Sequence, residues 1–203
     1  MTIRFHRGDL PDLARFRQAV AIDTETQGLN PHRDRLCLVQ LSPGDGSADI
    51  VQIAPGAAAP NLQRLLADGA ITKIFHYARF DMAVLFHRLG VMAEPVFCTK
   101  IASKLTRTYT DRHGLKDLVK DLLDIELSKQ QQSSDWAADT LSEAQLAYAA
   151  ADVLHLHALR ERLNMRLSRE SRSELAAACF RFLPTRAKLD LAGWGEDDIF
   201  SHQ

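Results

Sequence analysis

Residues 19–27 read AVAIDTETQ, and this stretch decides how the rest of the sequence is interpreted. It opens with the apolar run VAI at 20–22, which is typical of a short segment buried in a β-sheet. Asp23 and Glu25 follow where the interior of the strand should continue. Because residues two apart on a strand point to the same face, both carboxylates project together from the end of a buried element.

Two like charges held this close repel each other and raise each other's affinity for protons. A divalent cation between them is the usual way to stabilise such a pair. The pair alone leaves two interpretations open, a metal site and a solvated strand end with two unpaired acids. The rest of the sequence has to supply further ligands if the first interpretation is correct.

The composition describes an ordinary globular chain with room for one sizeable core. The chain has 203 residues, of which 46% are hydrophobic and 25% charged, and its formal net charge is −1. That charge argues against long-range capture of long nucleic acids, although a local basic groove is compatible with it. We find no apolar run long enough to cross a bilayer and no signal-peptide pattern at the N-terminus. The three cysteines are far apart and fit a reducing compartment, so we expect a cytoplasmic location.

Hydrophobic patterning and turn signals predict one α/β domain with a helical C-terminal part. The carboxylate strand and the predicted strands 36–41 and 48–53 follow one another and read as an antiparallel meander. Ser142 and Gln145 have the spacing of a capping box at the start of a long helix. The other predicted strands are 2–5, 73–76 and 96–99, and the predicted helices are 10–18 (capped by Asp9), 61–67 (capped by Asn61), 78–89, 100–105, 115–123, 143–170 and 173–182, the last stopped by Pro184.

Two further acidic residues lie on predicted helices. Asp81 lies on or beside the apolar stripe of helix 78–89, and an acid that breaks such a pattern tends to mark a function. Tyr148 and Asp152 are four residues apart and therefore share one face of the later helix. Three alanines between them clear space around both side chains, although an ordinary surface Tyr–Asp pair is the alternative.

The acidic segments together suggest a catalytic metal site made of Asp23, Glu25, Asp81, Asp152 and Tyr148. Four carboxylates cannot share a pocket unless divalent cations neutralise them, and hard oxygen ligands favour Mg²⁺ or Mn²⁺ over zinc. Two such ions about 4 Å apart would clamp a phosphodiester, one activating the attacking water and the other stabilising the leaving oxygen. A tyrosine with an ordinary pKa of about 10 is better suited to orienting that water than to acting as its base.

This set of motifs, in this order, resembles the DEDD superfamily of 3′–5′ exonucleases in its tyrosine variant, DEDDy. The segments DTETQGL (23–29), HYARFD (76–81), SDW (134–136) and LAYAAADVLHL (146–156) are similar to the catalytic domain of RNase D. The resemblance implies an RNase H-like (DnaQ-like) fold, with a mixed sheet flanked by helices. It places the exonuclease domain at 1–170 and leaves a C-terminal helix and tail at 171–203, as part of the same domain or as an oligomer contact.

Within that family the chain looks most similar to the small stand-alone nano-RNase C group. RNase D carries helical nucleic-acid-binding domains after its catalytic domain, whereas this sequence ends at Gln203. The resemblance implies hydrolysis of short RNA, down to dinucleotides, to nucleoside 5′-monophosphates, and assembly into a homo-oligomer. Trimming of longer RNA 3′ ends as in RNase D and cleavage of DNA are alternatives. A non-catalytic nucleic-acid-binding module is a third, although all five motif residues are present.

The same resemblance implies contacts to the substrate. We expect Thr26, Leu29, His76, Ser134 and Trp136 to bind it, with Leu29 wedged against the terminal bases and the SDW loop shaping the pocket. An ordinary loop leucine and a buried, satisfied histidine are the structural alternatives. A basic stretch is expected to contact phosphate, line an oligomer channel or simply be solvated, and it contains Lys100, Lys104, Arg107, Arg112 and Lys116.

Overall fold

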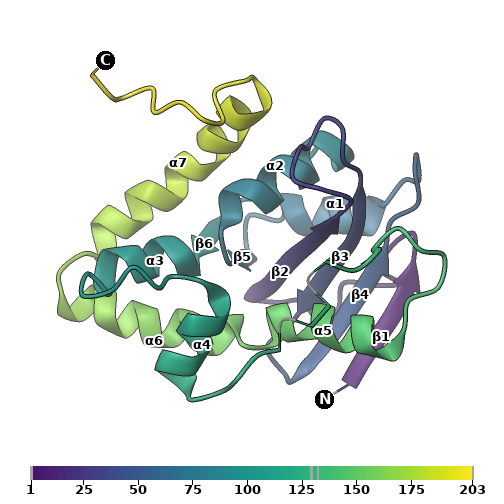
Figure 1. Cartoon of the computed structure of the whole chain (residues 1–203), viewed down its shortest axis with the longest axis horizontal. Coiled ribbons are helices and arrows are strands. Elements are labelled where there is room, and N and C mark those ends of the chain that lie inside the picture. Colours follow the sequence, from purple (N-terminus) through teal and green to yellow (C-terminus); the bar gives the residue numbers. More distant parts are fainter. Residues whose placement is uncertain (1, 129, 132, 203) are drawn as a thin grey trace.

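The computed structural model of the chain describes residues 2–128, 130–131 and 133–202, which form three layers with a six-stranded sheet in the middle (Figure 1). The strand order is β1-β4-β3-β2-β5-β6. The strands are β1 (Thr2–Arg7), β2 (Ala19–Thr26), β3 (Leu36–Ser42), β4 (Ser47–Gln52), β5 (Thr72–Phe75) and β6 (Val96–Cys98). The helices are α1 (Pro60–Ala67), α2 (Ala78–Leu89), α3 (Thr99–Thr106), α4 (Leu115–Leu123), α5 (Glu143–Leu154), α6 (Leu156–Arg169) and α7 (Ser173–Leu191).

The central strands β2, β3 and β4 form the predicted antiparallel meander. Strands β5 and β6 extend the sheet in parallel from β2, and β1 pairs in parallel with β4 at the opposite edge. The mixed sheet flanked by helices is therefore confirmed. Because β2 lies in the interior of the sheet and is covered on both faces, its first four residues are completely apolar and buried.

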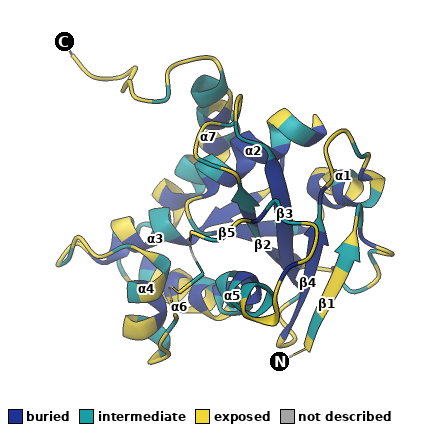
Figure 2. Ribbon diagram, turned by 45° about the vertical axis from the view of Figure 1, so that its right-hand side comes forward, coloured by how far each residue is buried: buried dark blue, intermediate teal, exposed yellow. Residues whose placement is uncertain are grey.

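The helices divide between the two faces of the sheet, and Figure 2 shows the inner strands buried between them, whereas the edge strand β1 is largely exposed. One core cluster joins α1, α2 and the second half of α7 to one face, and the other joins α5 and α6 to the opposite face. Helix α2 carries the predicted apolar stripe, and all four of its residues (Ala78, Met82, Leu85 and Leu89) are buried. The capping box of Ser142 and Gln145 is confirmed at the start of α5.

The predicted helix 10–18 is wrong, because this segment is irregular. Leu10 and Phe16 are buried in the core, which an irregular path allows them both to reach. The expected N-cap, Asp9, does cap a helix, but the helix is α1. Its carboxylate accepts hydrogen bonds from the backbone N–H groups of Asn61 (2.7 Å) and Leu62 (3.0 Å). The prediction that Asn61 caps α1 is also wrong, since α1 already begins at Pro60.

The long helix predicted over 143–170 is two helices, α5 and α6, which meet at His155. Helix α5 packs over β2, β3 and β4, whereas α6 packs against α3, α4 and the β5 side of the sheet. A break between them lets the chain cover both regions of a twisted sheet, which one straight helix could not do.

The prediction that Pro184 ends the last helix is wrong, because α7 continues to Leu191 with the proline inside it. Proline removes one backbone hydrogen bond at a cost of about 3 kcal/mol in a helix interior. The buried Leu183 and Ala187 pack on the core, and Asp190 pairs with Arg79 of α2, so tertiary contacts offset that cost. Within the described residues no helix combines the length and apolar character needed to cross a membrane.

Candidate active site

The alternation of side chains along β2 decides where its acidic residues point. Val20 and Ile22 belong to the core under α2, whereas Ala19 and Ala21 belong to the core under α5. Asp23 and Glu25 continue the second set of positions, as the period of two requires. Both carboxylates therefore leave the sheet on the side of α5.

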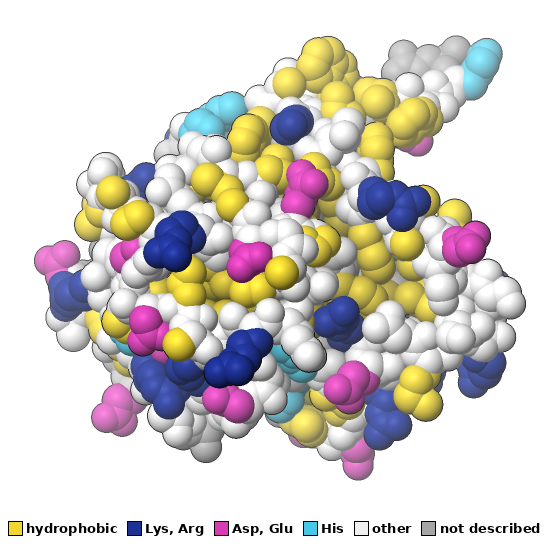
Figure 3. Space-filling model, turned by 180° about the vertical axis from the view of Figure 1, so that it is seen from behind, with side chains coloured by type: hydrophobic (Ala, Val, Ile, Leu, Met, Phe, Trp, Pro, Cys, Tyr) yellow, Lys and Arg dark blue, Asp and Glu magenta, His cyan; other side chains and the backbone are white. Residues whose placement is uncertain are grey.

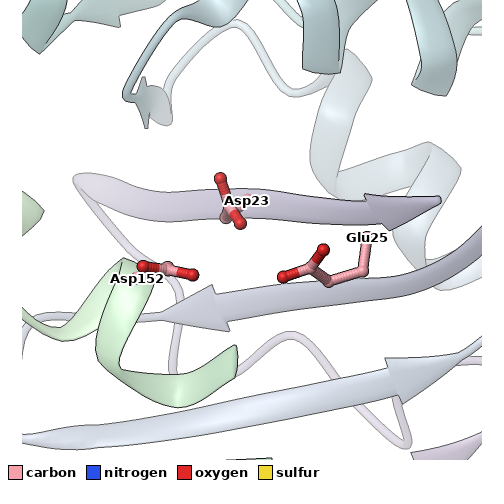
Figure 4. Close-up of side chains that lie close together, drawn as sticks. All are labelled: Asp23, Glu25 and Asp152. Carbon is pink, nitrogen blue, oxygen red and sulfur yellow. The ribbon is translucent and has the colours of Figure 1, made fainter. Parts of the chain in front are cut away.

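Asp152 meets them from α5. One carboxylate oxygen from each of Asp23, Glu25 and Asp152 can be chosen so that all three lie within 4.8 Å of one another. Figure 4 shows the three side chains turned toward a common space between the strand and the helix. The structure thus brings together three of the four predicted carboxylates. Asp152 meets the other two although it lies 127 positions after Glu25 in the sequence.

The fourth carboxylate, Asp81, lies in the first turn of α2 and is almost fully buried. Its Oδ1 accepts a hydrogen bond of 2.7 Å from the hydroxyl of Thr24, the residue between Asp23 and Glu25. Thr24 points to the other face of β2 and so connects α2 to the strand of the acidic cluster. Asp81 stands outside the tightest group of three but close enough to raise the pKa of Asp23.

The four acids resist ionisation in the absence of a cation. Burial raises the pKa of Glu25 to about 8, with Asp152 and Asp81 adding to the shift. Burial likewise raises the pKa of Asp81 and of Asp152 to about 7. The pKa of Asp23 lies well above its usual range, first through burial and then through the neighbouring acids. Partly buried carboxylates that hinder one another's ionisation are the arrangement that a divalent cation stabilises.

Tyr148 lies one helical turn before Asp152 and lines the same cavity. Burial, followed by the charges of Asp152 and Glu25, raises the pKa of its hydroxyl, so the phenol stays neutral at physiological pH. Its ring stacks on the buried Trp136, with centroids 5.9 Å apart and planes inclined by 30°. The structure therefore places Trp136 behind the tyrosine, where it holds the ring.

The cavity that contains the acidic cluster has a volume of about 360 Å³. Two lysines, Lys100 and Lys116, line it together with the N-terminus of α4 at Gly114 and Leu115. His76 also lines it, and burial lowers the pKa of this imidazole to about 3, so it is neutral. Its Nδ1 lies 2.9 Å from the hydroxyl of Thr99. Two positive charges, the neutral imidazole and one further acid, Asp117, thus line the cavity with the carboxylates of the cluster.

The other predicted substrate residues, Leu29, Thr26 and Ser134, are not among the residues that line this cavity. Leu29 is 82% exposed and lines a neighbouring groove of about 540 Å³ with Tyr77 and Phe80. The hydroxyl of Thr26 donates to the carbonyl of Gly28 and so stabilises the start of that loop. Ser134 is partly buried, and its hydroxyl donates to Gln131 of the same loop at 2.7 Å.

The basic residues between positions 100 and 116 do not form one continuous surface. Lys100 and Lys116 line the acidic cavity, and Arg112 is exposed. Arg107 is completely buried, where it bonds to Ser103, to the carbonyl of Arg112 and to Asp121. The expectation that Arg107 contacts phosphate is therefore wrong in this structure, because it is an internal brace of the loop before α4.

Two features of the site escaped the sequence interpretation. Thr24 lies between two candidate ligands, but its bond to Asp81 depends on the position of α2, which the sequence does not give. Tyr77 adopts a left-handed backbone conformation (φ 65°) immediately before α2, with the ammonium of Lys100 4.3 Å from its ring centroid. A strained conformation of a non-glycine residue has no reliable signature in sequence.

Several known proteins resemble this chain. The 3′-5′ exonuclease family matches residues 10–168. Ribonuclease D of Gluconacetobacter diazotrophicus is 38% identical over 159 residues, which are 78% of this chain and 40% of that protein. This chain therefore spans about two fifths of the length of the ribonuclease D relatives that it matches first.

Solved structures share the fold. Brucella melitensis NrnC with bound Mg²⁺ is 65% identical with a TM-score of 0.97, and NrnC bound to pGG is 66% identical with a TM-score of 0.98. Both matches cover 100% of this chain and 100% of the other. Escherichia coli RNase D is 26% identical with a TM-score of 0.76, over 86% of this chain and 46% of that one. These matches confirm the RNase H-like fold and the resemblance to the nano-RNase C group, and the chain belongs to the 3′-5′ exonuclease family, among the relatives of ribonuclease D and NrnC.

Proposed function

We propose that this protein is a metal-dependent 3′–5′ exoribonuclease that hydrolyses short oligoribonucleotides, down to dinucleotides, to nucleoside 5′-monophosphates. The observation that carries the proposal is the convergence of Asp23, Glu25 and Asp152 beside Tyr148, in a cavity that also exposes two lysines. Membership of the 3′-5′ exonuclease family supports the reaction type. The likeness to NrnC bound to pGG supports a substrate of very few nucleotides.

The donor set fits divalent cations, since the cluster offers carboxylate oxygens, which suit Mg²⁺ or Mn²⁺. Asp23, Glu25 and Asp152 would hold the ions, with Asp81 as the fourth acid of the site. When bound, such ions activate a water nucleophile and stabilise the charge on the phosphate and the leaving oxygen. The likeness to NrnC with bound Mg²⁺ supports magnesium as the first metal to test.

The other side chains of the cavity have roles that follow from their charge. Tyr148 keeps its proton, because its pKa is raised, and it can orient the attacking water by a hydrogen bond. Lys100 and Lys116 can neutralise phosphate oxygens of the substrate. Nδ1 of the neutral His76 donates to Thr99, whose own hydroxyl donates to the carbonyl of Phe75, so Nε2 can accept a hydrogen bond from a sugar hydroxyl. Leu29 is exposed enough to contact the terminal bases.

The experiment is a length series of uniformly labelled RNAs from two to thirty nucleotides, with Mg²⁺, with Mn²⁺ and with EDTA. We expect cleavage that EDTA abolishes and that releases 5′-monophosphates. Asp23→Asn is the matched inactive control, since it removes one ligand and keeps the size of the side chain. Preference for long RNA would favour trimming as in RNase D, and equal cleavage of matched DNA would remove the restriction to RNA.

We also propose that the protein acts as a homo-oligomer in the cytoplasm, with residues 171–203 as part of the exonuclease domain and a contact between copies. Helix α7 contributes Leu183 and Ala187 to the core, which supports assigning it to that domain. Beyond them the C-terminal segment exposes Trp194 and Phe200, which are 47% and 75% accessible. Exposed aromatic side chains of this kind are enriched in protein interfaces. Light scattering on the full chain and on a chain shortened before residue 194 tests the assembly.

A further inference from the structure

Gln40 lies in the middle of β3, in the stretch LCLVQLS, and its side chain is 0% exposed. Within the described part of the chain neither its Oε1 nor its Nε2 has a hydrogen-bond partner. Native proteins nearly always satisfy buried polar side chains, and each exception calls for a physical reason. A methionine would fill a similar volume here without the cost of desolvating an amide.

The position of Gln40 suggests that reason. In the pairing of β2 with β3, Gln40 lies directly opposite Asp23. Directly opposed residues of antiparallel strands point to the same face, with Cβ atoms about 5 Å apart. That face is covered by α5, which contacts both strands and carries Asp152. The unpartnered amide of Gln40 is therefore a buried neighbour of Asp23, on the face of the sheet that carries the acidic cluster.

The acids of the cluster differ in how they are held. Asp81 has a hydroxyl partner, Thr24, at 2.7 Å. Asp23 has a backbone partner, the N–H of Thr24, and among the described side chains we find none that donates a hydrogen bond to it. Carboxylates that bind metal ions are generally oriented by such an outer partner, and loss of the partner weakens the metal site. A glutamine has two N–H donors at the end of a flexible side chain, long enough to reach the carboxylate opposite it.

We propose that Gln40 is a positioning residue for Asp23. When the cluster holds its cations, Nε2 of Gln40 donates a hydrogen bond to one carboxylate oxygen of Asp23 and orients the other oxygen toward the ion. Gln40 acts through Asp23 and makes no contact with substrate. The inference rests on the proposed function, because it requires that the acidic cluster binds divalent cations.

The test compares wild type with Gln40→Met, Gln40→Asn and Leu41→Met. Methionine removes the donors at similar volume, and asparagine keeps the amide but shortens its reach. Leu41 lies next to Gln40 but faces the opposite core, so its variant controls for altered packing in β3. Titration calorimetry with Mn²⁺ and with Mg²⁺ gives the affinity, and thermal melting in EDTA gives the stability of the metal-free fold.

We expect Gln40→Met to melt in EDTA at or above the wild-type temperature, since it removes an unsatisfied buried amide. Its affinity for the cation should fall by about tenfold or more, the scale of losing an outer partner of a metal ligand. Gln40→Asn should show the same weakened affinity, and Leu41→Met should bind like wild type. Activity of both Gln40 variants should fall at low metal concentration and recover at saturating metal.

The outcomes separate the inference from the function on which it rests. Failure of wild type to bind either cation would overturn the proposed function itself. Normal binding by wild type together with unchanged affinity in Gln40→Met would overturn the role of Gln40 alone. If Gln40→Met melts in EDTA at a lower temperature than wild type, it no longer separates metal binding from folding, and the result for Gln40→Asn decides between the two roles. Weakened binding by a stable Gln40→Asn supports the inference, whereas early melting of both variants would mean that the amide serves the metal-free fold.

Discussion

Tyr148 lies on α5, the helix that also carries Asp152, and its ring stacks on the buried ring of Trp136. Tyr148 lines the acidic cavity, and burial raises the pKa of its hydroxyl, so it supplies a protonated phenol there. Such a group acts on the geometry of the nucleophile more than on the affinity for substrate.

We therefore predict that Tyr148→Phe lowers kcat by roughly 10²-fold while KM for a dinucleotide stays nearly unchanged. Phenylalanine keeps the stacking on Trp136, so the thermal stability should be close to that of wild type. Tyr109→Phe is the control, because Tyr109 is 70% exposed on a loop away from the cavity lining. A large rise in KM with normal kcat would mean that the tyrosine binds substrate instead.

The acidic cluster predicts an unusual pH dependence of stability. The folded pKa of Glu25 is about 8 and that of Asp152 about 7, whereas unfolded acids titrate near 4. Because the folded values are raised, the unfolded chain loses protons first, and stability falls as the pH rises from about 4 to about 8. We predict that the melting temperature in EDTA decreases from pH 5 to pH 9.

Glu25→Gln should flatten that decrease, since a neutral amide has no proton to lose, and it should also abolish cleavage. Mg²⁺ should restore the melting temperature of wild type at pH 8, because the cation stabilises the ionised carboxylates. Glu143→Gln, in the first turn of α5, is the matched control for loss of one glutamate outside the cluster. A pH profile in EDTA that is the same for wild type and Glu25→Gln would contradict the assignment.

The N-terminus of helix α1 is capped by a residue that lies far away in the sequence, since Asp9 is 52 positions before Asn61. Its own N-cap residue, Ala59, supplies no side-chain hydrogen bond, and the carboxylate of Asp9 accepts from two of the first backbone N–H groups instead. The same carboxylate accepts from the backbone of Leu10, so it joins the irregular segment after β1 to α1. A cap contributed across the fold can stabilise two elements at once.

We predict that Asp9→Ala lowers the free energy of unfolding by about 1–2 kcal/mol, the range for loss of a helix cap. The measurement is urea unfolding followed by far-UV circular dichroism. Asp12→Ala is the control, because Asp12 accepts only a local bond, from Ala14, in an exposed turn. Equal stability of the two variants would show that the cap contributes little.

The whole molecule has no net excess of positive charge with which to bind a long polyanion, since its 25 Lys and Arg residues are offset by 26 Asp and Glu residues. The net charge is −1, and in Figure 3 the basic and acidic side chains are interspersed across the face that is shown. The cavity itself is lined by Lys100 and Lys116. Affinity should therefore come from the last nucleotides of the substrate, and additional nucleotides should add little.

We predict that kcat/KM for a dinucleotide equals or exceeds that for a twenty-mer. The salt dependence of binding to an inactive Asp23→Asn variant should correspond to about one to three phosphates. Measurements of both RNAs at two salt concentrations check this. A steep salt dependence with preference for the twenty-mer would instead indicate a shared basic channel between copies, and trimming of longer RNA would be the better description.

The sequence by itself determined the segments that carry the chemistry. The spacing of Asp23 and Glu25 predicts a shared face because a strand has a period of two, and the spacing of Tyr148 and Asp152 does so because a helix has a period near four. Such local periods depend only on backbone geometry, and the meander, helix α2 and the capping box were predictable for the same reason. The family resemblance rested on these segments in their order along the chain.

Only the tertiary structure decided how distant segments meet. The cap that Asp9 gives to α1, the bond from Thr24 to Asp81 and the burial of Arg107 all join residues whose partners cannot be read from neighbouring positions. The break at His155 and the continuation of α7 through Pro184 follow from what each helix packs against. Local propensity sets a preference of about 1–3 kcal/mol, and the packing of a helix on the core is large enough to override it.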